Sequence, residues 1–229
     1  MKIYFIRHGH PDYKNNCLTE LGKIQASACA ERLKNSNIER IFSSTMGRAS
    51  QTAEFTAKLF DLEVTQYDFI REIGWTSIDG EPIIENGHPW LCADHLVSEG
   101  RPVADKDWRS IDPFCRSKVI DSVKTVSDGI DSWLSELGYQ RDGEYYRVLE
   151  KEPYKTVAMF SHAGSSTAAM SHMLNIPFPQ LCEILDVDFT SITIIELAGE
   201  VGSLVSPKIR ILNDAKHIEG ISSENFYGN

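Results

Sequence analysis

The stretch YFIRHGHPDY, residues 4–13, places two histidines one residue apart directly behind an apolar run. Residues 2–7 are short, aromatic and β-branched, and a glycine follows within two residues, which is typical of a buried strand. The alternate spacing of His8, His10 and Asp12 is compatible with a metal site, because alternate side chains project the same way. A phosphate site in which only one histidine reacts is equally compatible with this stretch.

The composition is that of a soluble globular protein. The chain of 229 residues can bury a sizeable core, with 41% hydrophobic and 24% charged residues. No apolar run approaches the roughly 20 residues that cross a bilayer. Because charges at Lys2 and Arg7 interrupt the N-terminus, it lacks a signal-peptide core of about 7 to 15 apolar residues. We therefore expect a cytoplasmic protein.

The net charge indicates which partners to expect, and the cysteines indicate their own redox state. A net charge of −10 repels nucleic acid and anionic membranes, so we expect neither as a partner. A small anionic substrate has to be attracted by a local cluster of arginines. The five cysteines are odd in number and form no C-x-x-C pair, which favours reduced thiols. The sequence leaves the oligomeric state open.

Strands and helices alternate along the chain. We predict strands at 2–7, 40–44, 63–70, 155–164, 191–197 and 208–212, and helices that open at Thr19 and cover 46–60 and 117–138. The predicted fold class is α/β, with three layers (α/β/α), a mostly parallel central sheet of about six strands and an inserted lid segment. We expect one domain over residues 1–229, with a flexible tail at about 221–229.

Residues 73–116 break this alternation. They carry three tryptophans and four prolines without a sustained period, which predicts a long insertion. Trp75, Trp90, Trp108 and Phe114 can form a core under this insertion or the apolar side of a substrate pocket. The sequence does not decide between these two roles.

Polar residues converge where the predicted strands end. In such sheets, ligands bind in the crevice at the carboxyl ends of the strands. The residues placed there are Arg7, His8, Arg48, Glu72 and His162. Two guanidinium groups match phosphate oxygens, and the helix after Ala163 adds backbone N–H groups, so we predict an anion site.

A metal site requires the opposite charge. Arg7 and Arg48 would repel a divalent cation and lower the pKa of His8, which leaves a neutral imidazole able to attack. Tyr13 also stands where zinc hydrolases with this spacing have a further histidine. We therefore expect neither a metal nor a cofactor.

Six short blocks of the chain resemble those of the histidine phosphatase superfamily, which has the phosphoglycerate mutase-like fold. They are RHG (7–9), LTELGKIQA (18–26), SSTMGRASQTAE (43–54), REIGW (71–75), SHAG (161–164) and LND (212–214). The blocks follow the family's order from Arg7 to about His217, and residues 73–154 match poorly. Together, these motifs are far more specific than RHG alone.

The resemblance implies a mechanism of phosphoryl transfer. His8 would attack phosphorus to give a phosphohistidine, while Arg7, Arg48 and His162 hold the phosphoryl oxygens. Glu72 would protonate the leaving alkoxide and then deprotonate the attacking water, which requires a raised pKa.

Four further positions have roles that the sequence leaves open. Asp79 and Glu81 follow on the same connection as Glu72 and could serve as the general acid in its place. Asn15 is a further candidate phosphate ligand, one residue beyond the family's usual asparagine. His10 replaces the acidic or amide residue common in the family, so we expect a pocket wall or a substrate contact there.

The segment EIGWTSIDGEP (72–82) favours a phosphatase. The mutases of this family follow the glutamate with a glycine-rich, lysine-bearing stretch that this segment lacks. Residues 79–116 hold eight acidic and four basic residues, which favours a phosphomonoester with an apolar or neutral body. A cofactor-dependent phosphoglycerate mutase and a non-catalytic phosphate-binding protein are also compatible with the sequence.

Overall fold

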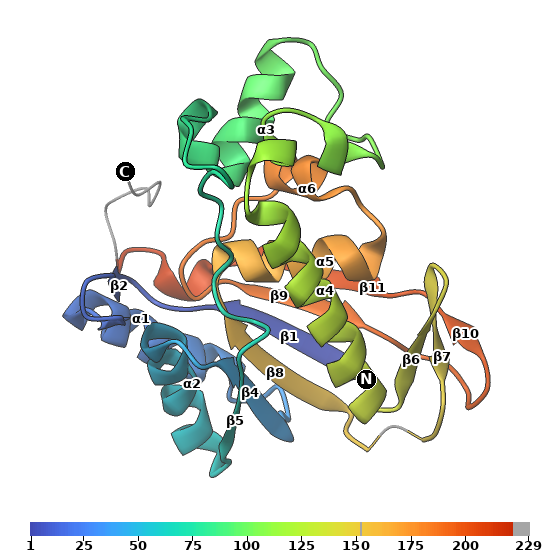
Figure 1. Ribbon diagram of the computed structural model, residues 1–229. Coiled ribbons are helices and arrows are strands. Elements are labelled where there is room, and N and C mark those ends of the chain that lie inside the picture. Colours follow the sequence, from blue (N-terminus) through green and yellow to red (C-terminus); the bar gives the residue numbers. More distant parts are fainter. Residues whose placement is uncertain (152, 222–229) are drawn as a thin grey trace.

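A six-stranded central sheet organises the protein. The computed structural model describes residues 1–151 and 153–221, so the predicted tail lies outside the described residues from residue 222 onward. The sheet has the strand order β11-β9-β1-β8-β4-β5 (Figure 1). Its strands are β1 (Lys2–Arg7), β4 (Arg40–Ser44), β5 (Val64–Tyr67), β8 (Thr156–Ser161), β9 (Ile192–Glu196) and β11 (Lys208–Asp214). Strands β1, β8, β4 and β5 are parallel to one another. Strand β9 runs antiparallel to β1, and β11 pairs antiparallel with β9 and so runs in the same direction as β1, which confirms the predicted, mostly parallel sheet.

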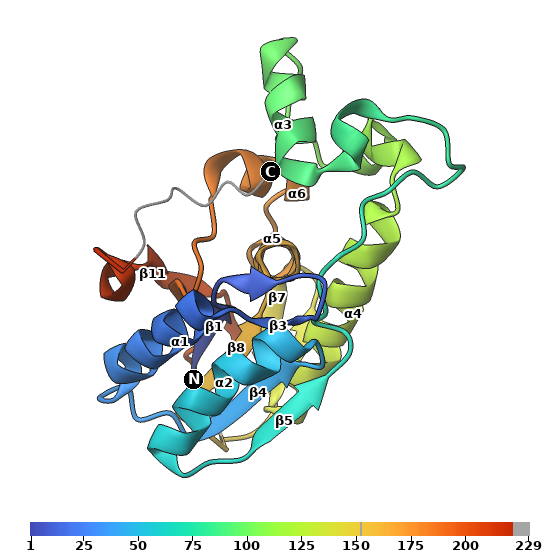
Figure 2. The ribbon, with the colours of Figure 1, turned by 90° about the vertical axis from the view of Figure 1, so that its left-hand side faces the viewer.

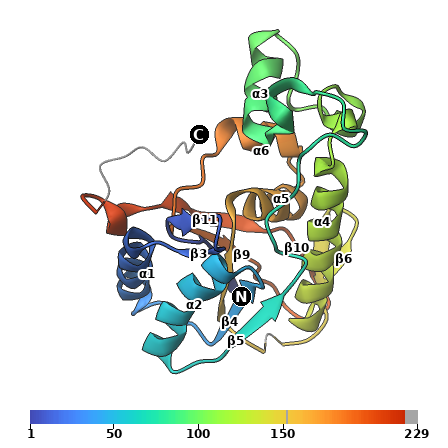
Figure 3. The ribbon, with the colours of Figure 1, turned by 60° about the vertical axis from the view of Figure 1, so that its left-hand side comes forward.

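Helices cover both faces of this sheet. The α-helices of the described residues are α1 (Glu20–Leu33), α2 (Gly47–Phe60), α3 (Pro89–Ser98), α4 (Val119–Glu136), α5 (Ala163–Leu174) and α6 (Phe178–Ile184). Helices α1 and α2 lie on one face and α4 and α5 on the other (Figures 2 and 3). The alternation along β1 explains the three layers, because Ile3 and Phe5 join one apolar core and Ile6 joins the other.

The start of α1 is pressed against the end of β1. Thr19 caps the helix by accepting a hydrogen bond from the N–H of Gly22. A Cβ atom at Gly22 would lie 2.2 Å from the carbonyl oxygen of His10, so only glycine allows this approach. The contact holds the segment after His8 in place.

The insertion at 73–116 is more regular than its sequence suggests. It contains α3, which begins with Pro89 at its first turn and ends before Gly100, in the left-handed conformation. Helix α3 packs on α6, above α5 (Figure 1). Trp108 and Phe114 are buried with ring centroids 5.6 Å apart, so these two residues form a core under the insertion.

Short antiparallel strands complete the fold. Strands β6 (Tyr139–Asp142), β7 (Tyr145–Val148) and β10 (Leu204–Val205) form a three-stranded sheet that the sequence did not predict, and β2 (Pro11–Asp12) pairs with β3 (Cys17–Leu18). These strands are too short for a clear period of two. None of the helices within residues 1–151 and 153–221 combines the length and hydropathy of a membrane span.

Candidate active site

The register of the parallel strands brings two histidines together. Arg7 pairs with Ser161 at the ends of β1 and β8, and the N–H of His8 donates to the carbonyl oxygen of Ser161 at 2.9 Å. The next residue on each strand is therefore a histidine at the same edge of the sheet. The ring centroids of His8 and His162 lie 5.1 Å apart, and both side chains are buried.

The hydrogen bonds of His8 define its tautomer. Its Nδ1 lies 2.7 Å from the carbonyl oxygen of Gly9, which can only accept, so Nδ1 carries the hydrogen. Arg48 Nε donates to Nε2 at 3.2 Å, so Nε2 presents its lone pair. Burial, followed by the neighbouring His162 and Arg7, lowers the pKa of His8 well below its usual range. His8 is thus a neutral imidazole whose Nε2 carries the lone pair, which accepts the hydrogen bond from Arg48.

Arg48 reaches this nitrogen from the first turn of α2. Its guanidinium also donates from Nη1 to Asn16 Oδ1 at 3.0 Å. A Cβ atom at Gly47 would lie 2.3 Å from the carbonyl oxygen of Asn16, so a glycine lets the helix start approach this turn. The exposed ring of Tyr13 lies 5.4 Å from the Arg48 guanidinium carbon, at the outer side of the site.

Arg7 supplies a second guanidinium from the end of β1. Its Nη1 donates to the carbonyl oxygen of Val187, and its guanidinium carbon lies 3.9 Å from the ring centroid of Phe189. Its buried Nε has no hydrogen-bond partner among the described residues. Burial lowers the pKa of Arg7 from its ordinary value, and the nearby Tyr13, Glu72 and Asp188 oppose this shift.

His162 begins α5 and faces the same cluster. Its Nε2 lies 2.9 Å from the hydroxyl of Ser44, which ends β4. Burial, followed by Arg48 and Arg7, lowers the pKa of His162 well below its usual range, so this ring is also neutral.

Glu72 is the carboxylate that the structure places beside these groups. Its Oε1 accepts from the N–H groups of Ile73 at 3.0 Å and Ser165 at 3.1 Å. Burial raises the pKa of Glu72 despite these bonds and the charges of Arg7 and Arg48. A carboxyl group with a raised pKa holds its proton to a higher pH than an ordinary glutamate, which favours a role as a proton donor.

Asp79 and Glu81, the two further candidates for the general acid, lie in a different environment. Both are exposed, and Asp79 accepts from the Ser77 hydroxyl at 2.6 Å and from the Glu81 N–H at 3.0 Å. These hydrogen bonds hold the pKa of Asp79 below its usual value. The structure therefore joins Glu72, and neither Asp79 nor Glu81, to the cluster that contains His8.

In the turn after β2, Asn16 rather than Asn15 contacts the cluster. Asn15 is exposed, and its Nδ2 donates to Asp12 at 2.7 Å, away from the cluster. The next residue, Asn16, is the one that reaches Arg48, in a left-handed conformation with φ of 51°. A phosphate contact of Asn15 stays a prediction. Sequence reasoning missed Asn16, although an asparagine at the end of a turn is a signal for this conformation.

His10 lies beside the cluster on the wall of the site. Its Nδ1 lies 2.9 Å from the Thr19 hydroxyl, and its ring centroid is 5.6 Å from that of Phe189. This position agrees with a wall residue. Phe189 itself carried no signal in the sequence, because it lies 181 residues from His8 in the chain and approaches it only through the pairing of β9 with β1.

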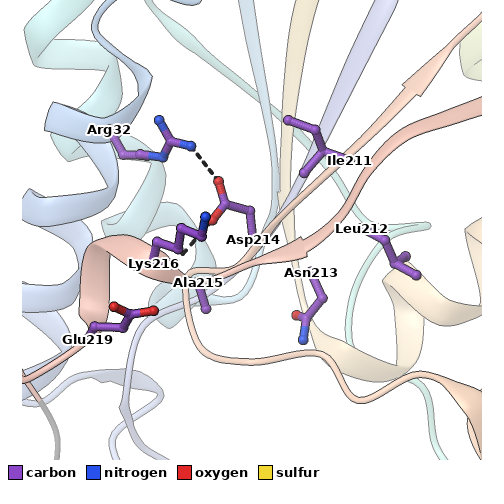
Figure 4. Close-up of a pocket in the computed structure, with 8 residues that line it drawn as sticks. All are labelled: Arg32, Ile211, Leu212, Asn213, Asp214, Ala215, Lys216 and Glu219. Carbon is purple, nitrogen blue, oxygen red and sulfur yellow. Dashed lines mark hydrogen bonds and ion pairs between the residues drawn. The ribbon is translucent and has the colours of Figure 1, made fainter.

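A separate hollow lies between α1 and β11 (Figure 4). Arg32 and Asp214 form an ion pair of 2.7 Å across it, and none of the cluster residues lines it. Groups of three or more His, Cys, Asp or Glu side chains that could hold a metal ion are absent from residues 1–151 and 153–221.

The chain resembles curated and solved proteins over most of its length. The probable phosphoglycerate mutase GpmB of Yersinia pestis is 23% identical over 231 residues, covering 91% of this chain and 97% of that protein. Mycobacterial glucosyl-3-phosphoglycerate phosphatase in complex with inorganic phosphate has a TM-score of 0.64 at 20% identity, covering 94% of this chain and 98% of that chain. Phosphoserine phosphatase of Entamoeba histolytica in complex with 3-phosphoglyceric acid has a TM-score of 0.60 at 21% identity, covering 95% and 98%.

At these identities, the solved structures establish a shared fold. The family model described as histidine phosphatase superfamily (branch 1) matches residues 3–209, which include all five clustered residues. The chain therefore belongs to the histidine phosphatase superfamily.

Proposed function

We propose that the protein is a phosphatase of small phosphomonoesters that acts through a phosphohistidine on His8. The observation that carries the proposal is the neutral His8 ring, whose Nε2 lone pair faces Arg48. A neutral imidazole is a nucleophile, and neighbouring guanidiniums stabilise the charge of a phosphoryl group in transfer.

The first step transfers the phosphoryl group to the enzyme. His8 Nε2 forms a bond to phosphorus as the ester P–O bond breaks, and Glu72 gives its proton to the leaving oxygen. Arg48 exchanges its hydrogen bond with Nε2 for one with a phosphoryl oxygen. Arg7 Nε, which lacks an acceptor among the described residues, donates to another oxygen, and His162 completes the set.

The second step releases phosphate. Glu72, now a carboxylate, takes a proton from water as the water oxygen attacks phosphorus. The N–P bond then breaks, its electron pair returns to Nε2, and His8 is neutral again. These two steps regenerate the enzyme with no cofactor.

The preference for a phosphatase rests on two kinds of support. The segment after Glu72 lacks the glycine- and lysine-rich stretch of the mutases, and the mycobacterial and Entamoeba proteins that share the fold carry phosphatase names. The acidic balance of residues 79–116 favours a substrate with an apolar or neutral body. We place this activity in a single domain over residues 1–229 in the cytoplasm.

Rapid quenching with a ³²P-labelled phosphomonoester tests the proposal directly. We expect acid-labile label on His8, and hydrolysis of para-nitrophenyl phosphate that falls at least about 10³-fold in His8→Ala. His95→Ala, which changes a histidine on α3, should keep its activity. Absence of both label and turnover would establish a non-catalytic phosphate-binding protein instead.

Two further assays distinguish the phosphatase from a metal hydrolase and from a mutase. A chelator should leave the activity unchanged, whereas loss of activity with chelator would indicate a metal hydrolase. Interconversion of 3-phosphoglycerate with a bisphosphate primer, faster than its hydrolysis, would indicate a mutase. A panel of phosphorylated metabolites then identifies the substrate.

A further inference from the structure

The segment Val187–Ser191, here called the 187–191 loop, lies directly behind the nucleophile. It connects α6 to β9, and β9 pairs antiparallel with β1. The N–H of Thr190 donates to the carbonyl oxygen of His8 at 3.3 Å, and the N–H of Arg7 donates to the carbonyl oxygen of Ser191 at 3.4 Å. The loop therefore contacts the backbone of both Arg7 and His8.

The same loop holds the Arg7 side chain. Its guanidinium carbon lies 3.9 Å from the ring centroid of Phe189, and Nη1 donates to the carbonyl oxygen of Val187. The ring of Phe189 is also 5.7 Å from that of His8, and the residue is only 5% exposed. Phe189 thus covers one face of the guanidinium, and the carbonyl oxygen of Val187 occupies Nη1. The Nε–H has no acceptor among the described residues and can donate to an anion.

The residue after Phe189 has an uncommon backbone conformation. Thr190 has a φ of 54°, a left-handed conformation that β-branched residues rarely adopt. Its hydroxyl donates to the carbonyl oxygen of Phe189 at 2.7 Å and lies 3.0 Å from His217 Nε2. Cys29 Sγ donates to the carbonyl oxygen of Thr190 at 3.6 Å. Strain that persists at such a point has to be held by its surroundings, and it is found at functional sites.

A second anchor fixes the loop from the side of β11. The N–H of Asp188 donates to Asn213 Oδ1 at 3.0 Å, and Asn213 Nδ2 donates to Asp188 Oδ2 at 2.8 Å. Asn213 also has a left-handed backbone, with a φ of 50°. The loop is therefore bound at both ends and in its middle, so the Phe189 ring is held against Arg7.

We infer that Phe189 is a positioning residue that fixes the plane of the Arg7 guanidinium for binding the transferred phosphoryl group. The inference rests on the proposed function. An arginine side chain has several rotamers, and binding an anion at a fixed place requires one of them. By stacking on one face, the ring of Phe189 selects that rotamer before the substrate arrives.

Phe189→Leu tests this role, because leucine retains an apolar side chain but lacks a ring face. We expect the dissociation constant for inorganic phosphate, measured by calorimetry, and the KM for para-nitrophenyl phosphate to rise about tenfold. The matched control is Phe178→Leu, which changes a buried phenylalanine that packs on Trp108. This control should change the phosphate affinity less than about twofold for a comparable loss of thermal stability. Equal phosphate affinities in the two variants would overturn the inference.

A double-mutant cycle with Arg7→Lys shows whether Phe189 acts through Arg7. In the Arg7→Lys background, Phe189→Leu should weaken phosphate binding by less than about twofold, since the planar group on which the ring acts is gone. A full further tenfold loss would contradict a role through Arg7.

The proposed function and this inference fail in different ways. Wild-type protein that binds phosphate but never forms a phosphohistidine would overturn the function, while the cycle still decides the role of Phe189. Wild-type protein that binds no phosphate would overturn both.

Discussion

At the scale of single residues, burial shifts the pKa values of the histidines and of the glutamate in opposite directions, and both shifts favour the proposed reaction. It lowers the pKa values of His8 and His162, which keeps both rings neutral, and raises that of Glu72, which therefore holds its proton to a higher pH than an ordinary glutamate. The pKa values of His8 and Glu72 are therefore shifted in the directions that the proposed nucleophile and the proposed acid require. Such a separation of pKa values is typical of the acid and the nucleophile of an active site.

Glu72→Gln should slow the reaction of substrates whose leaving group has to be protonated, and spare substrates whose leaving group does not. With an alkyl phosphate, phosphorylation of His8 should fall about 10²- to 10⁴-fold, whereas para-nitrophenyl phosphate should still phosphorylate the enzyme in a burst. The phosphohistidine should then accumulate, because no base activates water. Rapid-quench measurements give both rates, and Asp79→Asn and Glu81→Gln are the matched controls. A larger loss in either control would assign the acid to that residue.

The same raised pKa predicts the pH dependence of the wild-type enzyme. Glu72 holds its proton to a higher pH than an ordinary glutamate, so kcat/KM for alkyl phosphates should decline as the pH rises through that raised value. On the acid side, activity should persist well below pH 6.5, because the pKa of His8 is lowered from 6.5. A pH profile of kcat/KM checks both limbs, and an alkaline limb retained in Glu72→Gln would contradict the assignment.

At the scale of elements, the site depends on where strands and helices end. Strands β1, β8 and β4 are parallel neighbours, so Arg7, His162 and Ser44 lie at one edge of the sheet. The first turn of α5 then contributes a backbone N–H to Glu72. Helix α5 can approach Glu72 this closely because residue 164 is a glycine.

Gly164→Ala should reduce activity without unfolding the protein. The added Cβ would lie 2.6 Å from Glu72 Oε1 and 2.5 Å from Ile73 Cγ1, so the acid has to move. A displacement on the order of 1 Å costs about 10²-fold in rate, which we expect for kcat with an alkyl phosphate. The control is Gly129→Ala on α4, where the added Cβ clashes with Phe69, so stability should fall while kcat stays near wild type. Unchanged kcat in Gly164→Ala would show that α5 does not position the acid.

At the scale of the whole molecule, a chain with net charge −10 surrounds a site that holds the buried Arg48, the half-buried Arg7 and two neutral histidines. Neutral buried histidines couple this site to folding. On unfolding, their pKa values return toward the usual value, so the unfolded chain binds more protons in mildly acidic solution. Burial also lowers the pKa values of His88 and His217.

The protein should therefore lose stability between pH 7.5 and pH 5.5. Histidines with a lowered folded pKa contribute full stability above about pH 6.5 and lose it as the pH falls toward the folded value, by up to about 1.4 kcal/mol per pH unit each. Glu72 opposes this only above about pH 4.5, where the folded state retains a proton that the unfolded state releases. Since about 1 kcal/mol corresponds to about 2–4 °C at this size, Tm should be several degrees lower at pH 5.5. Calorimetry at pH 7.5 and pH 5.5 measures this difference in Tm. A smaller Tm difference in His162→Asn than in the wild type would identify His162 as one of the histidines responsible. An equal or higher wild-type Tm at pH 5.5 would contradict the prediction.

Local sequence indicated the six strands of the central sheet, most helices and four of the five clustered residues. Apolar periodicity is a property of a few adjacent residues, and Arg7, His8, Arg48 and His162 each adjoin a strand end that this periodicity marks. Helix α3 escaped prediction because the insertion that contains it shows no sustained apolar period, and strands β6 and β7 escaped because each has only four residues.

Only the tertiary structure decided which side chains surround His8. The strand order, the choice of Asn16 over Asn15 beside Arg48, and the packing of Phe189 on Arg7 depend on contacts between distant parts of the chain. The shifted pKa values have the same origin, because burial is set by the whole fold. A sequence pattern reports what a residue can do, whereas its protonation and its partners follow from the residues that folding places around it.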